Sequence, residues 1–185
     1  MRPPPRDARF VSYLLSLAEA DDQAALAALL RGLGKPPGAV PEMLRWLSPW
    51  TRSLGLREAG IRLQVASLFA LHPSHVAQGN MGSTCAALRD LPGTGASLEQ
   101  RFVALLNCRT EALPGHLRRV ISLARQAGIA VNWAQLLVDL RYWDHPERFV
   151  QIAWAHAFWG SERQDSATPP TSSATPLMET TGHRY

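Results

Sequence analysis

Hydrophobic residues recur along this chain at the three- and four-residue spacing of amphipathic helices. In the segment Ala8 to Ala20, one face of such a helix collects Phe10, Val11, Leu14, Leu17 and Ala18. A helical turn takes 3.6 residues, so residues at this spacing line one side of a helix. No stretch alternates strictly between apolar and polar residues in the way that a half-buried strand does. The pattern predicts an all-α chain of about nine helices.

Residues that cap or break helices set the expected boundaries. Asp7 is expected to cap the first helix, and Ser97 and Asp144 each open a capping box before the sixth and ninth helices. The ninth helix is expected to end near Trp159. The other helices are expected at 21–30, 41–47, 56–70, from the segment 79–82 to 90, at 114–128 and from 132 onward.

Loop composition divides the chain further. A Pro/Gly loop at 91–96 is expected to separate two small helical bundles, residues 1–92 and 93–160. After Gly160 the sequence becomes rich in Ser, Thr and Pro, and such a segment cannot bury enough apolar surface to order itself. Residues 161–185 are therefore predicted to form a disordered tail.

Charge and cysteine content restrict the class of partner and the compartment. The 185 residues carry a net charge of +4, with Lys35 as the single lysine among 19 basic residues. Arginine offers a planar fork suited to phosphate, so the balance favours nucleic acid or another acidic partner. Cys85 and Cys108 form no Cys-x-x-Cys pair, which fits a reduced compartment. With no apolar run of about 18 residues and no signal-peptide pattern, we expect a cytoplasmic protein without membrane contact.

Motifs for catalysis, metals or cofactors are weak. His72 and His75 lack the further ligands of a metal site, and the segment Gly79–Thr84 lacks the lysine of a phosphate-binding loop. Asp139 is interpreted as an exposed helical residue, and no nucleophile elbow of the Gly-x-Ser-x-Gly type occurs. We therefore expect no enzymatic activity, no metal and no cofactor.

The arginines give a sharper signal. On the predicted helix 114–128, Leu117 and Ile121 share the buried face, which places Arg118 and Arg125 together on one flank. The alternative is a solvated surface or local ion pairing, but for the set as a whole phosphate contact is favoured. The candidates from charge alone are Arg52, Arg57, Arg125 and Arg141.

The predicted ninth helix leaves a second function open. It is apolar on nearly all sides, so it lies either at the centre of its bundle or against a partner. The protein could then be a helical adaptor that docks a partner through this aromatic helix, with binding that survives high salt. A stand-alone DNA-binding regulator is less favoured, because no helix-turn-helix with a polar recognition face is evident.

The order and spacing of several blocks resemble one protein family. The blocks are Leu98-Glu99-Gln100-Arg101-Phe102 with Leu105-Leu106 and Arg109, Leu117-Arg118-Arg119, Val131-Asn132-Trp133 with Leu136-Leu137, Asp139-Leu140 and Trp143, Gly79-Asn80-Met81-Gly82, and Val40-Pro41 with Arg45 and Pro49. In this order they resemble the CasB family, the small subunits of the type I-E CRISPR Cascade complex. The likeness covers roughly residues 8–160 and leaves out the tail.

The resemblance implies a non-enzymatic subunit of a ribonucleoprotein. The expected partners are other Cascade subunits, a second copy of the chain, the CRISPR RNA–DNA hybrid and the displaced single-stranded DNA. Base pairing then supplies sequence specificity while the protein holds the backbone. By matched position, the implied nucleic-acid-binding residues are Arg45, Arg101, Arg109, Arg118 and Arg119. Ser83 departs from the family, in which a basic residue is common at that position.

Overall fold

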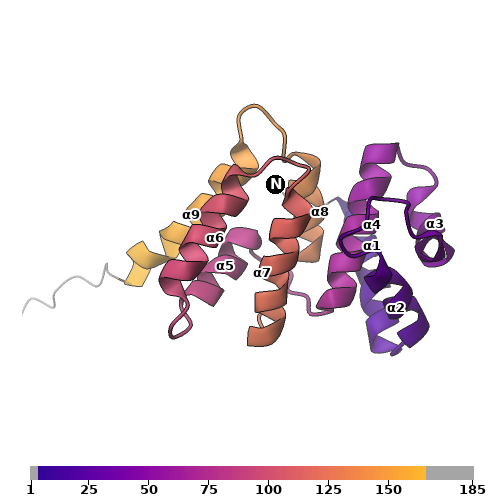
Figure 1. Cartoon of the computed structure of the whole chain (residues 1–185), viewed down its shortest axis with the longest axis horizontal. Coiled ribbons are helices and arrows are strands. Elements are labelled where there is room, and N and C mark those ends of the chain that lie inside the picture. The colour runs from indigo at the N-terminus through magenta and orange to yellow at the C-terminus, as the bar shows by residue number, and fades with distance from the viewer. Residues whose placement is uncertain (1–3, 166–185) are drawn as a thin grey trace, which may run out of the picture.

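The computed structural model describes residues 4–165, and in that part every named element of secondary structure is a helix. Nine α-helices and one short 3₁₀ helix (η1) follow one another, as predicted from the apolar spacing (Figure 1). Their bounds are α1 Pro5–Glu19, α2 Gln23–Arg31, η1 Pro41–Met43, α3 Leu44–Thr51, α4 Leu56–Leu71, α5 Met81–Arg89, α6 Gly95–Asn107, α7 Leu113–Ala127, α8 Trp133–Arg141 and α9 Phe149–Asp165. Within the described residues, none of these helices combines the length and apolar content needed to cross a bilayer.

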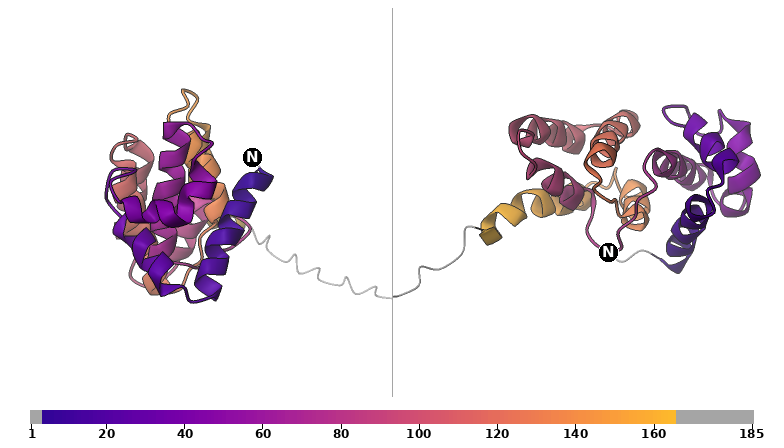
Figure 2. Two further views of the ribbon diagram at one scale, coloured as in Figure 1. Left: turned by 90° about the vertical axis from the view of Figure 1, so that its right-hand side faces the viewer. Right: turned by 90° about the horizontal axis from the view of Figure 1, so that it is seen from below.

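The helices form two groups with α8 between them. Figure 1 shows α1 to α4 on one side of α8, and α5, α6, α7 and α9 on the other. The view from below in Figure 2 separates the same two groups. α8 packs against α4 and α1, while α5 packs against α9, α6 and α7. The division of the chain into bundles 1–92 and 93–160 stays a prediction.

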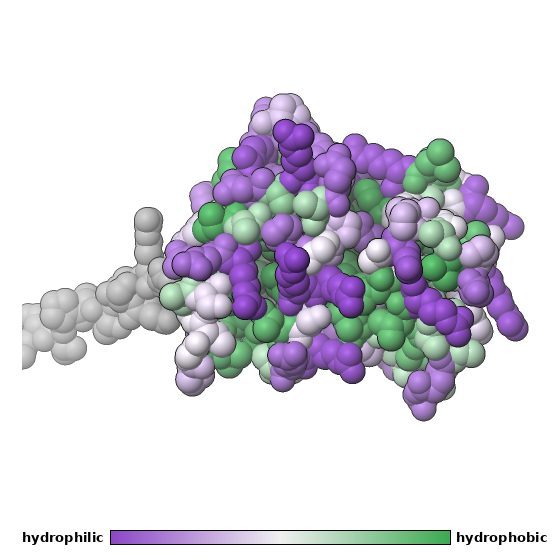
Figure 3. Space-filling view, in the orientation of Figure 1, coloured by the Kyte–Doolittle hydropathy of each residue, from purple (hydrophilic) through white to green (hydrophobic). Residues whose placement is uncertain are grey.

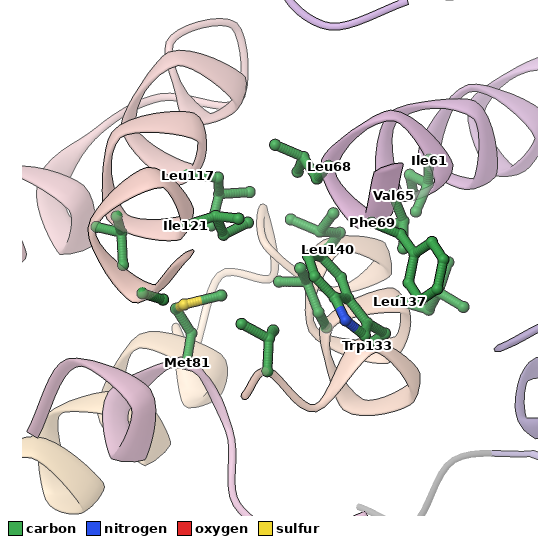
Figure 4. Packing of buried hydrophobic residues seen from close by; sticks show 14 of the residues in the cluster. Ile61, Val65, Leu68, Phe69, Met81, Leu117, Ile121, Trp133, Leu137 and Leu140 are labelled. Carbon is green, nitrogen blue, oxygen red and sulfur yellow. The ribbon is translucent and has the colours of Figure 1, made fainter. Parts of the chain in front are cut away.

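The apolar faces of both groups meet in one continuous core. α4 contributes Ile61 and Phe69, α8 contributes Trp133 and Leu137, and α7 contributes Leu117, all in the same buried cluster (Figure 4). Burial of a side chain of this size stabilises the fold by about 1.5–3 kcal/mol. α4 packs directly against α7, and α8 adds its side chains to the shared core, so α4 and α8 together join the two groups.

Two expected helix caps are absent. Asp7 was predicted to cap α1, but Pro4 occupies the cap position, and Asp7 lies inside the helix, where its buried carboxylate binds Arg62. Ser97 was predicted to open α6, but the helix begins at Gly95, because the preceding turn is already helical. The Thr94 hydroxyl closes that turn by donating to the Leu88 carbonyl at 2.7 Å.

The end of the chain also differs from the prediction. Asp144 does not cap α9, which begins at Phe149, and its carboxylate instead accepts hydrogen bonds from Thr110 and Arg57. α9 runs to Asp165, so it takes in the first residues of the segment predicted as a tail from residue 161. The rest of that predicted tail lies outside the described residues.

Candidate nucleic-acid interface

α7 presents the most basic helical surface of the described chain. Pro114 stands in its first turn, and Gly128 ends it in the left-handed conformation at φ +68°. Leu117 and Ile121 are buried, as the spacing predicted. The helix has no acidic residue, and its solvent side carries Arg118, Arg119 and Arg125, all exposed.

Arg118 lies close to the other group of helices. It shares one flank of α7 with Arg125, two turns away, and this flank faces the loop between α2 and η1. A Cβ added to Gly34 in that loop would stand 3.5 Å from the Arg118 Nη1 atom. Because Lys35 is the next residue, the loop brings a second basic side chain to the junction between the two groups.

Arg101 on α6 borders a groove on the other flank of α7. The groove has a volume of about 470 Å³ and is lined by side chains such as Leu98 of α6 and Leu123 and Gln126 of α7. Figure 3 shows strongly hydrophilic side chains over α6 and α7 with apolar surface between them. We call the set formed by Arg101, Arg118, Arg119 and Arg125 the α6–α7 basic surface.

None of these four arginines forms an ion pair within residues 4–160, where the ion pairs of the structure involve other arginines. Their guanidinium donors face solvent. Exposed arginines without carboxylate partners suit contact with phosphate groups, which accept bidentate hydrogen bonds from the planar fork. The α6–α7 basic surface therefore has the chemistry to contact phosphate groups.

The other candidate arginines lie elsewhere on the surface. Arg109 is exposed in the connection between α6 and α7. On α3, the Arg45 guanidinium lies over the ring of Trp46, 5.4 Å from its centroid, and Arg52 is exposed just after the helix. The structure therefore does not bring Arg45 and Arg52 together with the α6–α7 basic surface in one cluster of contacts.

Arg141 and Arg57 belong to ion pairs. Arg141 binds Asp7 and Glu58 and lies at the contact of α8 with α1 and α4, with a side chain 24% exposed. The hydrogen bonds from Arg141 lower the pKa of the Glu58 carboxyl and raise that of Arg141 itself. Arg57 pairs with Asp144 at 3.0 Å on the surface. A guanidinium held by two carboxylates has few donors left for phosphate.

Arg62 shows how far charge alone can mislead. It follows Arg57 on the same helix by five residues, yet its side chain is 1% exposed and pairs with Asp7 at 2.8 Å. Its guanidinium also lies over the Phe10 ring, 5.0 Å from the centroid. Burial lowers the pKa of Arg62, and the carboxylates of Asp7 and Glu58 oppose that shift. Arg62 is thus part of the core rather than of a basic face.

The segment from Gly79 to Thr84 serves a structural purpose. The Asn80 side chain accepts from the Ser83 amide at 3.2 Å, and the Ser83 hydroxyl accepts from the Asn80 amide at 2.8 Å. This reciprocal pair is a capping box that starts α5. Because it uses the Ser83 amide, a phosphate would find fewer free donors here.

His72, His75 and Cys85 are held within the fold. The His72 Nε2 atom lies 2.8 Å from the Ile129 carbonyl, and the His75 Nδ1 atom lies 3.2 Å from that of Val131. Burial raises the pKa of the Cys85 thiol to about 12, so this thiol stays protonated and unreactive. In the described part of the chain, no three His, Cys, Asp or Glu side chains gather as metal ligands do.

Sequence reasoning also placed Asp139 wrongly. It was interpreted as exposed, but it is 6% exposed and accepts a hydrogen bond from the Trp154 indole at 2.6 Å. The available signal was its position inside the apolar run from Leu136 to Leu140.

Three comparisons relate the chain to known proteins. A family model described as CRISPR-associated protein Cse2 matches residues 25–159. A CRISPR-associated protein Cse2 from Thermus thermophilus is 35% identical over 157 residues, which cover 83% of this chain and 89% of that protein. The crystal structure of CasB from Thermus thermophilus has a TM-score of 0.73 at 30% identity and covers 86% of this chain and 99% of its own.

A second similar structure has a more distant sequence. A chain of a solved CRISPR RNA-guided surveillance complex has a TM-score of 0.73 at 22% identity, over 87% of this chain and 95% of its own. At that identity the likeness concerns the fold. The helical arrangement described above is therefore shared with proteins of one family and with a chain found inside a larger assembly.

Proposed function

The chain belongs to the Cse2 family of CRISPR-associated proteins, and from this membership we propose that it is a non-catalytic small subunit of a type I-E CRISPR Cascade surveillance complex. Its partners in that role are the other Cascade subunits, a second copy of itself, and the CRISPR RNA paired with target DNA. The chain of similar fold in a CRISPR RNA-guided surveillance complex supports this assignment. The site of action is then the cytoplasm, away from membranes.

The proposed activity is sequence-independent binding of the displaced DNA strand, together with bracing of the guide RNA–target hybrid. This rests chiefly on the α6–α7 basic surface, with its exposed arginines and the absence of acidic residues on α7. Guanidinium groups that contact phosphates release counterions, which stabilises the R-loop without reading bases. Arg109, Arg45 and Arg52 extend the proposed contact set, whereas Arg57 and Arg141 contribute mainly through their ion pairs.

The adaptor alternative has less support. The aromatic side chains expected to dock a partner from α9 are mostly used inside the fold, since Trp154 and Phe158 are fully buried. Ile152 is 50% exposed on the outer side of α9. Its exposed neighbours Ala153 and Arg148 are not aromatic, so Ile152 does not belong to an aromatic surface. Burial-driven docking through α9 would therefore have little aromatic area to use.

A tagged purification from the native host tests the assembly. We expect a large particle that contains several protein subunits and a short repeat-derived RNA. Recovery of the protein alone, or with a single partner and no RNA, would overturn the proposal and favour the adaptor. The particle also provides the material for measuring R-loop lifetime.

A triple substitution tests the proposed surface. Changing Arg101, Arg118 and Arg119 to Ala should shorten R-loop lifetime and lower the log–log salt slope by about 2, since each contact with single-stranded phosphate adds about 0.7. The matched control changes three exposed arginines on α1 and α2 to Ala, namely Arg6, Arg9 and Arg31. Equal losses in both variants would show that only net charge matters, and no loss in the first would remove the site assignment.

A further inference from the structure

A cavity formed by other segments of the chain than the α6–α7 basic surface has an acidic rather than a basic lining. It lies where α8, the first turns of α9 and the start of α5 meet, and has a volume of about 200 Å³. Its lining residues are Gly79, Asn80, Gln135, Asp139, Phe149, Val150 and Ala153. The polar groups of this lining are one carboxylate and two amides, and no basic side chain belongs to it. The cavity is too small for a nucleotide but large enough for the head of one side chain.

Asp139 supplies the carboxylate, and its charge is poorly compensated. One oxygen accepts from the Gln135 Nε2 atom at 2.7 Å, and the other accepts from the Trp154 Nε1 atom at 2.6 Å. Both donors are neutral, and within residues 4–160 no Lys, Arg or His forms an ion pair with this carboxylate. Burial raises the pKa of Asp139, while the hydrogen bonds from Gln135 and Trp154 oppose that shift. A buried carboxylate in this state is stabilised by a cation.

The remaining lining fits one kind of cation best. A carboxylate has about four acceptor sites, of which two are used here, so each oxygen retains one for a further donor. A planar guanidinium can address both oxygens at once. Phe149 adds an aromatic wall that attracts cations, and the amide oxygens of Asn80 and Gln135 offer further acceptors. An anionic ligand would instead be repelled.

We infer that this cavity is a binding site for a guanidinium group, which Asp139 holds. The group can come from an arginine of a neighbouring protein chain or from this chain itself. Arg2 stands only two residues before the described part begins, and α1 packs against α8, where Asp7 pairs with Arg141. The two sources share the same chemistry at Asp139 and differ only in whether residue 2 is required.

Titration of the full-length protein with ethylguanidinium tests the site. The indole N–H of Trp154 donates to Asp139, so its NMR cross-peak reports on what the carboxylate binds. We expect a saturable shift with ethylguanidinium at a concentration at least tenfold below any effect of ethylurea, its neutral analogue. Asp139→Asn should abolish the saturable shift, whereas Glu19→Gln, which removes an exposed carboxylate on α1, should leave it unchanged.

A second variant keeps the carboxylate and obstructs the cavity. Ala153→Leu enlarges a side chain of the lining on a helix, and it should also remove the saturable shift while Asp139 stays in place. This variant guards against failure of Asp139→Asn to fold. Equal shifts with ethylurea, or persistence of the ethylguanidinium shift in both variants, would overturn the inference and leave Asp139 as an acceptor for Trp154 alone.

The source of the natural guanidinium is assigned by Arg2→Ala. If residue 2 occupies the cavity, this variant should bind ethylguanidinium at least tenfold more tightly than the unchanged chain. If affinity is the same, the guanidinium comes from another chain. Either result supports the site, and neither depends on whether the chain binds DNA.

Discussion

At the scale of single residues, the charged groups of this protein divide into two kinds that sequence does not distinguish. Arg57 and Arg62 lie on the same helix, but Arg57 pairs with Asp144 in solvent while Arg62 pairs with Asp7 in the core. Solvent screens the first pair, so it contributes little. The second pair is removed from water on folding, so each charge needs the other to compensate for its lost hydration.

Replacement of Asp7 should therefore be costly. Asp7→Ala leaves the buried Arg62 guanidinium without its partner, and we expect a loss of about 3–5 kcal/mol in the free energy of unfolding. Asp144→Ala removes the exposed partner of Arg57 and should cost less than about 1 kcal/mol. Urea denaturation of both variants measures the difference. Similar losses would mean that the Asp7–Arg62 pair is not desolvated in solution.

A double replacement separates the charge from the packing. Asp7→Leu combined with Arg62→Met exchanges the buried pair for apolar side chains of similar length. Such exchanges are often neutral in other proteins, so we expect the double variant to recover most of the stability lost in Asp7→Ala. Because Asp7 also binds Arg141, recovery should be incomplete.

At the scale of elements, close contact between α5 and α9 depends on one glycine. A Cβ added to Gly82 would stand 2.1 Å from the Trp154 carbonyl oxygen and 2.7 Å from its carbon, both of which are backbone atoms. A helix backbone cannot give way as a flexible side chain can. The segment Gly79–Gly82 thus starts α5 and also sets how near α9 can approach.

Gly82→Ala should separate the two helices. We expect a loss of at least about 2 kcal/mol, the cost of forcing extra volume into a packed contact. Gly115 on α7 is the matched control, because nothing lies within 4 Å of its added Cβ. Gly115→Ala should stabilise the protein by about 0.5–1 kcal/mol through helix propensity. Thermal unfolding of both variants gives the comparison. Unchanged stability of Gly82→Ala would contradict the close approach of α5 to α9.

The connection between α4 and α5 contains a group sensitive to pH. The His75 Nδ1 atom accepts from the Trp133 amide at 3.4 Å and lies near the Val131 carbonyl. Burial lowers the pKa of His75 below its ordinary value of 6.5. The folded state then binds this proton less readily than the unfolded chain does. Its contribution to stability is complete above pH 6.5 and is lost as the pH falls through the lowered pKa.

His75→Gln should reduce the pH dependence of stability. Between pH 7 and pH 5, the unchanged protein should lose free energy of unfolding more steeply than the variant, by at most about 1.4 kcal/mol per pH unit. His156→Gln, which changes an exposed histidine on α9, should keep the original slope. Parallel curves for the two variants would mean that His75 titrates as freely as an exposed histidine.

At the scale of the whole molecule, sequence predicts what depends on neighbours along the chain. Apolar spacing predicts α4 and α7. The exposed position of Arg118 follows from the position of the buried face of α7. What sequence could not give is which helices meet. From the sequence Asp139 is expected to be exposed, but Trp154 of α9 covers it. Arg62 has the charge of a surface residue, but Asp7 of α1 pairs with it in the core. The wrong prediction for Asp139 and the burial of Arg62 both arise from contacts between distant segments.

The central position of α8 predicts how the molecule unfolds. Because α4, α7 and α8 contribute apolar side chains to one core shared by both groups, unfolding of either group would expose buried apolar surface of the other. We expect one cooperative transition, in which far-ultraviolet circular dichroism and tryptophan fluorescence coincide. Trp133→Ala removes a fully buried ring from α8 and should lower stability by about 3–5 kcal/mol while keeping a single transition. If the two signals separate instead, the groups unfold independently, as two autonomous bundles divided near residue 92 would.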